Sequence, residues 1–285
     1  MTRQMAKKGK NKEARLKAPK MSKTADRYAL YLQSVQAPDV DAAFFSKVYK
    51  KEFGQPAKTL REDFCGTFAV CCEWAKRGDD MVAYGVDLDP EPLAWGATHN
   101  LLPLSEAQKA RVHTLEADVR AANTPKVDVL AAQNFSYCIF KTRQELARYF
   151  KVAHDSLANK GVFVLDLFGG YESIEDNKEE TTEHDGFDYI WEQHKYDPIN
   201  AYGTYKIHFR FPDGSQMKNA FVYDWRLWTI PEVREVLHEV GFGQVDVYWE
   251  GTDPKTQEGS GRYYKALQAD CDPAWTCYIV GVKGA

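Results

Sequence analysis

The segments TLREDFCGTF (residues 59–68) and MVAYGVDLDP (residues 81–90) decide the fold. The first predicts a strand that leads through a turn at Gly66 into a helix over residues 69–77. The second is a short apolar strand that ends at Asp87 and precedes another predicted helix. Alternation of short apolar strands with helices is typical of a parallel sheet with helices on both faces. These segments therefore predict an α/β protein.

Three more strands continue the pattern along the chain. Residues 111–115 and 128–132 are expected to be short strands, and 162–168 is almost continuously apolar, as in a strand buried on both faces. The spacing of apolar residues predicts an amphipathic helix over 144–158, ended by Gly161. Ligands of such sheets bind at the carboxyl ends of the strands. Four residues that end or follow strands are expected at that edge: Gly66, Asp87, Asp118 and Asn134.

The chain changes character after Gly169. Apolar and polar residues alternate in stretches of 187–226, and the sequence PDGS at 212–215 is a strong turn signal. We therefore expect an antiparallel β-insertion at about 170–227, directly after the fifth strand.

The remaining elements complete the sheet. Thr229 and Glu232 form a capping box that begins a helix, and Gly241 ends it. Strands over 245–249 and 275–282 follow. Together with the five earlier strands they predict a seven-stranded, mostly parallel sheet with helices on both faces.

The composition fits one large domain. Of the 285 residues, 44% are hydrophobic and 27% are charged, which excludes a collagen, a coiled-coil rod and a wholly disordered chain. No stretch approaches ~18 uninterrupted apolar residues, so we expect no spanning helix and no membrane partner. We divide the chain into a tail (1–25), N-terminal helices (26–55) and the α/β domain (56–285).

Positive charge is concentrated at the N-terminus. Residues 1–27 hold ten Lys or Arg and two acids, a net of +8, which leaves −12 for the rest of a chain whose total is −4. Two interpretations stay open. The tail is a disordered, solubilising segment, or it is an arm that binds nucleic acid or an acidic partner. The acidic body argues against a broad nucleic-acid surface.

The six cysteines favour a reducing compartment. None forms a C-x-x-C pair, and no His lies at zinc-finger spacing near two of them, so we expect no metal site. A chain of this length does not need disulfides for stability. We therefore expect reduced thiols and a cytoplasmic location.

The order of these elements, with acids at strand ends, resembles that of the class I S-adenosylmethionine-dependent methyltransferases over roughly residues 55–285. The glycine-rich first motif of that family corresponds to the first segment quoted above. Cys65-Gly66-Thr67 matches in place and Glu62 takes the acidic position, which implies that these residues bind the cofactor. Phe64 and Phe68 replace the two outer glycines, so we expect them either to tolerate the bend or to narrow the pocket.

The second and third motifs of the family also have counterparts. Asp87, followed by Leu88, resembles the acid that accepts hydrogen bonds from both ribose hydroxyls of the cofactor. The alternative is that Asp87 only caps the next helix. Asp118 and Val119 resemble the third motif, in which an acid accepts from the adenine amine, and an exposed turn is the alternative.

The loop Asn134-Phe135-Ser136-Tyr137 follows the fourth strand. It resembles loops of amine-methylating enzymes, including small-molecule N-methyltransferases related to glycine N-methyltransferase. The resemblance implies that Asn134 lies beside the cofactor and that Tyr137 contacts the substrate as a catalytic residue. A turn Asn next to a core Tyr is the alternative.

The β-insertion is expected to bind the substrate, because it follows the fifth strand and is rich in aromatic residues. Trp191 is a candidate for an aromatic pocket suited to cationic or planar substrates, and sheet packing is the alternative. His208 is a candidate catalytic base or a solvent-facing side chain. Arg226 is a candidate to bind a substrate carboxylate or phosphate, or it forms a structural salt bridge.

The resemblance implies an enzyme that uses S-adenosylmethionine, releases S-adenosylhomocysteine and methylates a nitrogen (or oxygen) of a small molecule. The N-terminal helix with Tyr28 and Tyr31 corresponds in position to a segment that lids the cofactor in related enzymes. The alternative is an RNA or protein methyltransferase, or a weakly catalytic assembly module, that acts through the basic tail.

Overall fold

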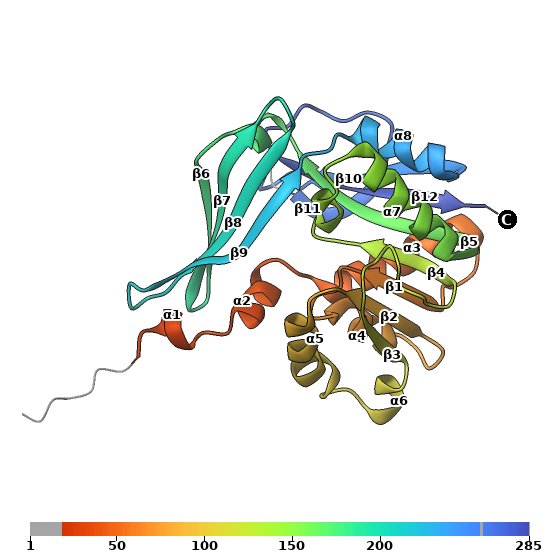
Figure 1. Cartoon of the computed structure of the whole chain (residues 1–285), viewed down its shortest axis with the longest axis horizontal. Helices are drawn as coiled ribbons and strands as arrows, with labels where there is room; N and C mark the ends of the chain where they lie inside the picture. Colours follow the sequence, from red (N-terminus) through yellow and green to blue (C-terminus); the bar gives the residue numbers. More distant parts are fainter. Residues whose placement is uncertain (1–18, 257–258, 285) are drawn as a thin grey trace, which may run out of the picture.

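The computed structural model describes residues 19–256 and 259–284, which contain a central eight-stranded sheet (Figure 1). Its strand order is β11-β10-β12-β5-β4-β1-β2-β3. The bounds are β1 Thr59–Asp63, β2 Val82–Asp87, β3 Val112–Glu116, β4 Val127–Ala132, β5 Leu157–Gly169, β10 Gln244–Thr252, β11 Gly259–Ala266 and β12 Trp275–Lys283. Strands β1 to β5 pair in parallel, and β12, β10 and β11 pair antiparallel. The predicted α/β fold with a mostly parallel sheet is confirmed.

One strand of this sheet escaped the sequence analysis. The prediction was seven strands, and β11 is an eighth, paired to β10 at the edge of the sheet. Its residues are exposed or half-buried throughout. An edge strand that buries no continuous apolar face leaves no alternation in the sequence, which is why the pattern did not indicate it.

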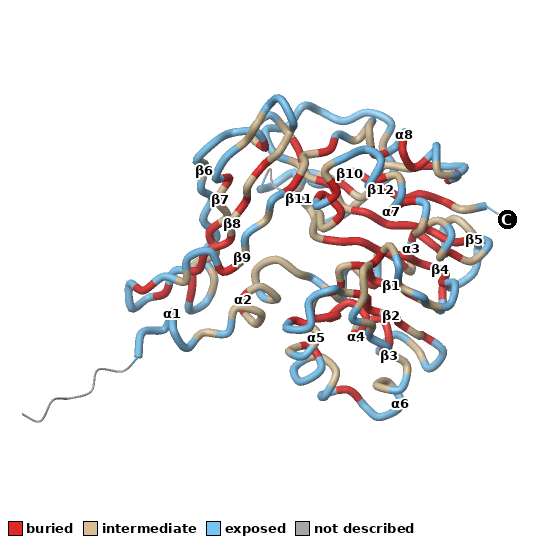
Figure 2. Tube along the Cα trace, viewed as in Figure 1, coloured by how far each residue is buried: buried red, intermediate tan, exposed pale blue. Residues whose placement is uncertain are grey.

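Helices cover both faces of the central sheet. Their bounds are α3 Pro38–Phe53, α4 Ala69–Lys76, α5 Pro90–Gly96 with its continuation η1 Ala97–Leu101, α6 Glu106–Lys109, η2 Ser136–Ile139, α7 Arg143–Ser156 and α8 Ile230–Val240. Helices α3 and α4 share one buried cluster with the sheet, and α7 and α8 share the other. Figure 2 shows the buried segments concentrated in the strands between these two layers.

The ends of α8 agree with the prediction and the end of α7 does not. Thr229 and Glu232 form the expected capping box, and Gly241 ends the helix with φ 119°. Helix α7, however, ends at Ser156, and Gly161 lies within β5. A Cβ at Gly161 would lie 2.8 Å from Leu157 Cβ. This glycine therefore allows a close approach inside β5 and is not a helix stop.

The β-insertion is a separate four-stranded antiparallel sheet with the order β6-β7-β8-β9. It follows β5 and the turn η3 Tyr171–Ile174, and precedes α8. The strands are β6 Lys178–His184, β7 Phe187–Asp197, β8 Tyr202–Arg210 and β9 Gln216–Arg226. Figure 1 shows this inserted sheet standing beside the central sheet, where its strands form a wall of their own.

The N-terminal helices run along the inserted sheet (Figure 1). Helix α1 (Met21–Thr24) docks on the β8–β9 turn, because the Met21 N–H donates to Asp213 Oδ2 at 2.9 Å. Helix α2 (Arg27–Ser34) follows. The tail predicted for residues 1–25 thus includes a short docked helix, and its first 18 residues lie outside the described part of the chain. Over the residues described, no helix is both long and apolar enough to cross a membrane.

Candidate active site

The turn between β1 and α4 has the left-handed backbone that glycine usually supplies. Phe64, Gly66 and Phe68 have φ values of 57°, 52° and 45°. The Gly66 N–H donates to Asp87 Oδ2 at 2.7 Å. No atom lies within 4 Å of the place that a Cβ on Gly66 would occupy. The turn therefore keeps a glycine-like conformation and leaves open space over its backbone.

Phe68 does not narrow this space, because its ring points into the core. The residue is 1% exposed, and glycines at positions 85 and 96 make room for it. A Cβ on Gly96 would lie 2.6 Å from Phe68 Cε1 and 2.3 Å from the Thr67 carbonyl oxygen. Phe64, in contrast, lies on a cavity wall, with its ring against those of Phe140 and Tyr149. Neither residue closes the pocket.

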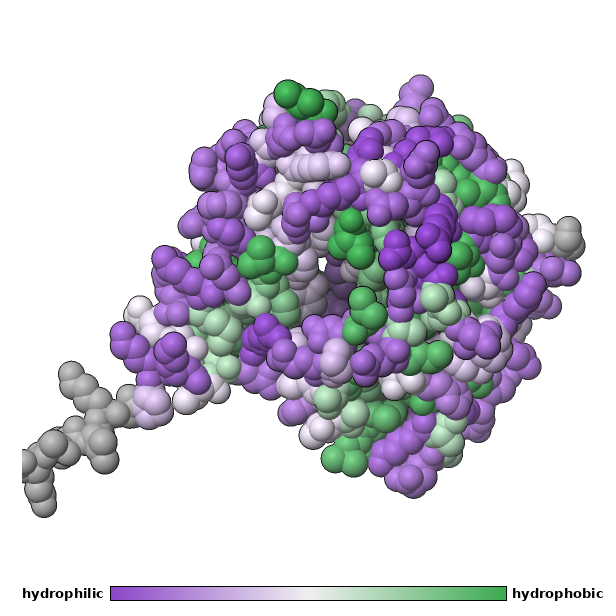
Figure 3. All heavy atoms as spheres, in the orientation of Figure 1, coloured by the Kyte–Doolittle hydropathy of each residue, from purple (hydrophilic) through white to green (hydrophobic). Residues whose placement is uncertain are grey.

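Three adjoining cavities run along the carboxyl ends of the parallel strands. The β2 cavity has a volume of about 550 Å³, the central cavity about 470 Å³, and the sheet cavity, beside the inserted sheet, about 410 Å³. The β2 and central cavities share Phe64, Asp87 and Asp89. The central and sheet cavities share Tyr31, Asn134 and Tyr223. Figure 3 shows the molecular surface hollowed between the inserted sheet and the body.

The structure brings together all the predicted cofactor residues except Glu62. Seven of them line the central cavity: Tyr28, Tyr31, Cys65, Gly66, Thr67, Asp87 and Asn134. The β2 cavity is lined by the other three, together with Asp87: Leu88, Asp118 and Val119. Residues from α2 and from the ends of β1, β2 and β4 therefore meet in one place, as the parallel topology requires.

Asp87 is the acid shared by the two cavities. Its Oδ2 accepts the Gly66 N–H, and its Oδ1 accepts the Asp89 N–H at 2.9 Å. Burial raises the pKa of Asp87 above its ordinary value, and these backbone N–H groups oppose the shift. A carboxylate has about four acceptor positions. Asp87 thus retains acceptor capacity for a ligand in the cavities that it lines.

Helix α2 closes the central cavity on its outer side. Trp95 Nε1–H donates to Asp26 Oδ2 at 2.6 Å, and Arg27 pairs with Glu91 at 2.7 Å. These contacts fasten α2 to α5. Gln36, just after the helix, lines the central cavity, and its buried Oε1 has no hydrogen-bond partner among the described residues. A buried amide oxygen of this kind is a candidate acceptor for a bound molecule.

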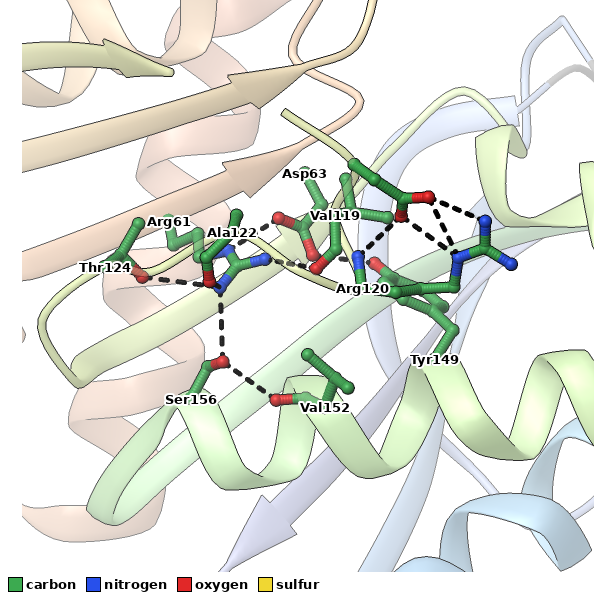
Figure 4. A network of polar contacts seen from close by, with 10 residues as sticks. Arg61, Asp63, Val119, Arg120, Ala122, Thr124, Tyr149, Val152 and Ser156 are labelled. Atoms are coloured by element: carbon green, nitrogen blue, oxygen red, sulfur yellow. Dashed lines mark hydrogen bonds and ion pairs between the residues drawn. The ribbon is translucent and has the colours of Figure 1, made fainter. Parts of the chain in front are cut away.

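A buried arginine, Arg61, holds the loop after β3 through the carbonyl of Val119 (Figure 4). Arg61 is fully buried, and its guanidinium donates to Asp63 Oδ1 at 2.6 Å and to the Val119 carbonyl at 2.7 Å. Tyr149 O–H donates to the other Asp63 oxygen at 3.0 Å. Arg61 thereby ties β1 to the floor of the β2 cavity. Arg61 was not among the predicted site residues, although an Arg within a predicted central strand is a signal of a paired buried charge.

Asp118 itself is engaged by its neighbour. Arg120 donates to the Asp118 carboxylate from Nε and Nη2, the latter at 2.6 Å, and these bonds hold the pKa of Asp118 below its usual value. The carboxylate stays ionised and faces the β2 cavity.

Glu62 lies behind the turn and lines none of the three cavities. It is 4% exposed, and its Oε2 accepts from the Cys71 N–H at 3.2 Å and from the Cys71 thiol at 3.1 Å. Burial raises the pKa of Glu62 to about 8. The predicted role as a direct cofactor ligand is therefore corrected, because Glu62 tethers the start of α4.

The loop after β4 is shaped by Asp166, a residue that the sequence analysis missed. Asn134 and Phe135 both have left-handed backbones, with φ of 56° and 57°. Their N–H groups donate to Asp166 Oδ2 and Oδ1 at 2.7 and 2.9 Å. Burial raises the pKa of Asp166 to about 7. The sequence signal that could have identified Asp166 is that it is the one acid inside the apolar run 162–168.

The predictions for Tyr137, His208 and Arg226 are corrected by their positions, since none of the three lines these cavities. Tyr137 is fully buried, and its hydroxyl donates to the Asp166 carbonyl at 2.9 Å. His208 lies on the opposite face of the inserted sheet, where Nε2 pairs with Glu192 at 2.6 Å. Its Nδ1 accepts the Asn219 N–H at 2.8 Å.

Arg226 has the structural role that was the alternative interpretation. Its guanidinium pairs with Glu232 at 2.9 Å and lies 3.7 Å from the centre of the Trp228 ring. Trp191, by contrast, lines the sheet cavity with its ring stacked on Tyr205 at 5.4 Å. Among the residues described, no group of three or more His, Cys, Asp or Glu is arranged to hold a metal ion.

We compared the chain with known protein families, curated proteins and solved structures. Neither protein-family profiles nor curated proteins match the chain. An S-adenosylmethionine-dependent methyltransferase from Clostridium acetobutylicum ATCC 824 is 16% identical, with a TM-score of 0.63 over 90% of this chain and 98% of that one. DesVI of Streptomyces venezuelae is 19% identical, with a TM-score of 0.65 over 92% of this chain and 98% of its own.

A third structure was solved with the cofactor bound. It is CalS10, an amino pentose methyltransferase from Micromonospora echinaspora, which is 17% identical with a TM-score of 0.62 over 90% of this chain and 95% of its own. Identities this low carry the fold alone. The chain has the fold of the class I S-adenosylmethionine-dependent methyltransferases.

Proposed function

We propose that this protein transfers a methyl group from S-adenosylmethionine to a nitrogen (or oxygen) of a small molecule. The observation that carries the proposal is Asp87, which faces both the β2 and the central cavity at the end of β2, beside the open turn at Gly66. The sheet cavity adjoins the central one through Tyr31, Asn134 and Tyr223. A cofactor and an acceptor thus have separate but connected places.

The residues present fit the cofactor. Asp87 has acceptor capacity for the two ribose hydroxyls, and Asp118 faces the β2 cavity as an acceptor for the adenine amine. The unpartnered Gln36 oxygen offers an acceptor to the amino-acid end. The space over Gly66 admits a ligand close to the backbone.

When bound, S-adenosylmethionine supplies an activated methyl carbon: the new bond to nitrogen forms as the carbon–sulfur bond breaks, the electron pair stays on sulfur, and S-adenosylhomocysteine remains. The protein's own task is to align the acceptor nitrogen with the methyl group and to exclude water from the site. Helix α2 covers the central cavity, and the Tyr31 and Tyr223 side chains lie where the two cavities meet. Burial raises the pKa of Tyr31 to about 12, so it stays protonated near the acceptor. The proton of a methylated amine leaves to water.

Thermal unfolding with and without S-adenosylhomocysteine tests the proposal. Ligand at ~100 times its Kd adds roughly 2.7 kcal/mol to the free energy of unfolding. In Asp87→Asn we expect affinity to fall roughly 10- to 100-fold, because hydrogen bonds to a charged group contribute about 1.5–3 kcal/mol. Asp79→Asn, at an exposed turn position before β2, makes the same change away from the cavity and serves as the control.

Two results would contradict the proposal. One is the absence of any shift in melting temperature with the cofactor or its product. The other is equal loss of affinity in the Asp87 and Asp79 variants. If the melting temperature rises in the natural chain and in Asp79→Asn but not in Asp87→Asn, amines and alcohols should be screened as methyl acceptors.

A further inference from the structure

The sheet cavity is walled by aromatic rings. Trp191 on β7 and Tyr223 and Trp225 on β9 line it, and Tyr223 stacks on Trp225 with ring centres 4.4 Å apart. Trp191 stacks on Tyr205 on its other side, so the wall is two rings deep. Tyr189 and Trp275 add further aromatic surface. Aromatic faces attract cations through their quadrupoles, and Trp does so most strongly.

The charged residues of this cavity are mostly acids. Glu172 on η3, Glu180 on β6 and Glu250 on β10 line it, against the single base Lys178, a formal net of −2. Lys178 is already neutralised: it pairs with Glu172, with Glu180 at 2.9 Å and with Glu175 at 3.8 Å. The hydrogen bonds that Lys178 donates to Glu172 and Glu180 raise the pKa of Lys178. No Arg is among the lining residues described.

This combination selects against anions. A phosphate or carboxylate entering the sheet cavity would meet carboxylates and a lysine that is already paired, at the cost of its own hydration. A cation would meet the aromatic wall and a lining whose formal net charge is −2. The three acids line the sheet cavity only, whereas the residues shared with the central cavity, Tyr31, Asn134 and Tyr223, are uncharged.

We propose, on the basis of the proposed function, that the methyl acceptor is a small cation that carries no phosphate. Its charged nitrogen lies against Trp191 and Trp225 near Glu180, and a second, neutral nitrogen or hydroxyl reaches the Tyr31–Tyr223 junction. Glu180 and Trp191 are then specificity-determining residues, which favour a cationic over an anionic substrate.

The test uses matched probes. Choline and phenyltrimethylammonium are compared with their uncharged carbon isosteres, 3,3-dimethylbutan-1-ol and tert-butylbenzene, by tryptophan fluorescence and calorimetry. Uridine 5′-diphosphate is the anionic probe. We expect each cation to bind about tenfold more tightly than its isostere, because a tenfold change corresponds to about 1.4 kcal/mol, which lies within the range of cation–π contacts. The nucleotide is expected to bind more weakly than either cation.

Variants separate charge from packing. Glu180→Gln should weaken cation binding several-fold and strengthen binding of the diphosphate, because it removes an acid that both faces the cavity and neutralises Lys178. Glu179→Gln is the matched control, one residue away on the same strand and exposed. Trp191→Leu keeps an apolar side chain and should remove the preference for cations over isosteres.

Several outcomes would overturn the inference. They are equal binding of cations and isosteres, a nucleotide that binds more tightly than the cations, or identical effects of the Glu179 and Glu180 changes. S-adenosylhomocysteine binding is measured on the same samples. If that binding is intact while cation preference is absent, the substrate class is wrong and the proposed methyl transfer stands. If that binding is absent, the proposed function itself fails.

Discussion

Phe68 combines an unfavourable backbone with a favourable side chain. A left-handed conformation costs a non-glycine residue about 1–2 kcal/mol, and Phe68 adopts φ 45°. Full burial of a phenylalanine ring contributes about 1.5–3 kcal/mol, and this ring is 1% exposed. The second term outweighs the first. The first motif lacks its outer glycines. Gly85 and Gly96, against which Phe68 packs, provide the space that the larger side chain needs.

Glu62 leads to a prediction about pH at the same scale. Its pKa is about 8 in the folded chain and about 4.5 in an unfolded one. Between these values the folded state holds one more proton, so this residue lowers the free energy of unfolding as pH rises from about 4.5 to 8. The slope for one proton is about 1.4 kcal/mol per pH unit.

We expect Glu62→Gln to remove that slope, so that the stability of the variant relative to the natural chain improves as pH rises. Urea unfolding at pH 5, 6, 7 and 8 measures it. Glu73→Gln, on the neighbouring helix α4 and half-exposed, is the control. A difference between natural chain and variant that stays constant across this range would show that Glu62 is not protonated in the folded state.

Among the elements, α2 is attached to the body of the protein by a few side chains. It is eight residues long and contributes only Leu30 to the buried core. Its attachment to the body comes from Asp26 and Arg27, which contact Trp95 and Glu91 of α5. Its other side packs on the inserted sheet, where the rings of Tyr31 and Phe221 are 4.8 Å apart. Helix α2 therefore bridges the body and the inserted sheet over the central cavity.

Removing the N-cap of α2 should weaken this bridge. Asp26 accepts the Tyr28 N–H at 2.9 Å and the Trp95 Nε1–H at 2.6 Å. Loss of such a cap costs about 1 kcal/mol, so for Asp26→Ala we expect a roughly fivefold weaker affinity for S-adenosylhomocysteine. The melting temperature without ligand should change little. Calorimetry measures the affinity, and hydrogen exchange of residues 27–34 should become faster.

Asp39→Ala, an exposed acid in the first turn of α3, is the matched control. If the affinity for S-adenosylhomocysteine falls equally in both variants, the effect comes from the loss of one negative charge and not from the position of α2 over the cavity. Unchanged affinity in Asp26→Ala together with faster exchange would mean that α2 opens without any consequence for the cofactor site.

For the whole molecule, the described residues of the binding site and the basic N-terminal segment occupy different parts of the sequence. The described cavity residues begin at Arg27, whereas residues 2–18 hold seven Lys or Arg and one acid. We expect deletion of residues 2–18, which leaves α1 in place, to change affinity for S-adenosylhomocysteine and choline by less than about twofold, the size of ordinary surface effects.

The same deletion tests the alternative function. If the tail binds a polyanion, the full chain is retained on heparin at low salt and released steeply as salt rises, and the deletion removes that retention. Loss of cofactor affinity on deletion would contradict the separation of tail and site. Retention on heparin with intact cofactor binding would add a partner without changing the proposed chemistry.

Local sequence patterns were enough to predict most of the strands and helices, the acid at the end of β2 and the position of the β-insertion. These features are local: periodicity marks each element, and parallel strands necessarily bring Gly66, Asp87, Asp118 and Asn134 to one edge. The edge strand β11 was invisible because it buries no continuous apolar face.

Which side chains reach the cavities depends on packing between distant parts of the chain. The alternation of β8 put His208 on the face opposite Ile207, but which face meets the body depends on how the inserted sheet packs. Tyr137 lies in the core, where its loop forms hydrogen bonds to Asp166, a residue from another strand. Glu180 and Glu250 meet at one cavity from strands 70 residues apart. Contacts between distant segments are set by the packing of the whole chain, and local periodicity does not encode them.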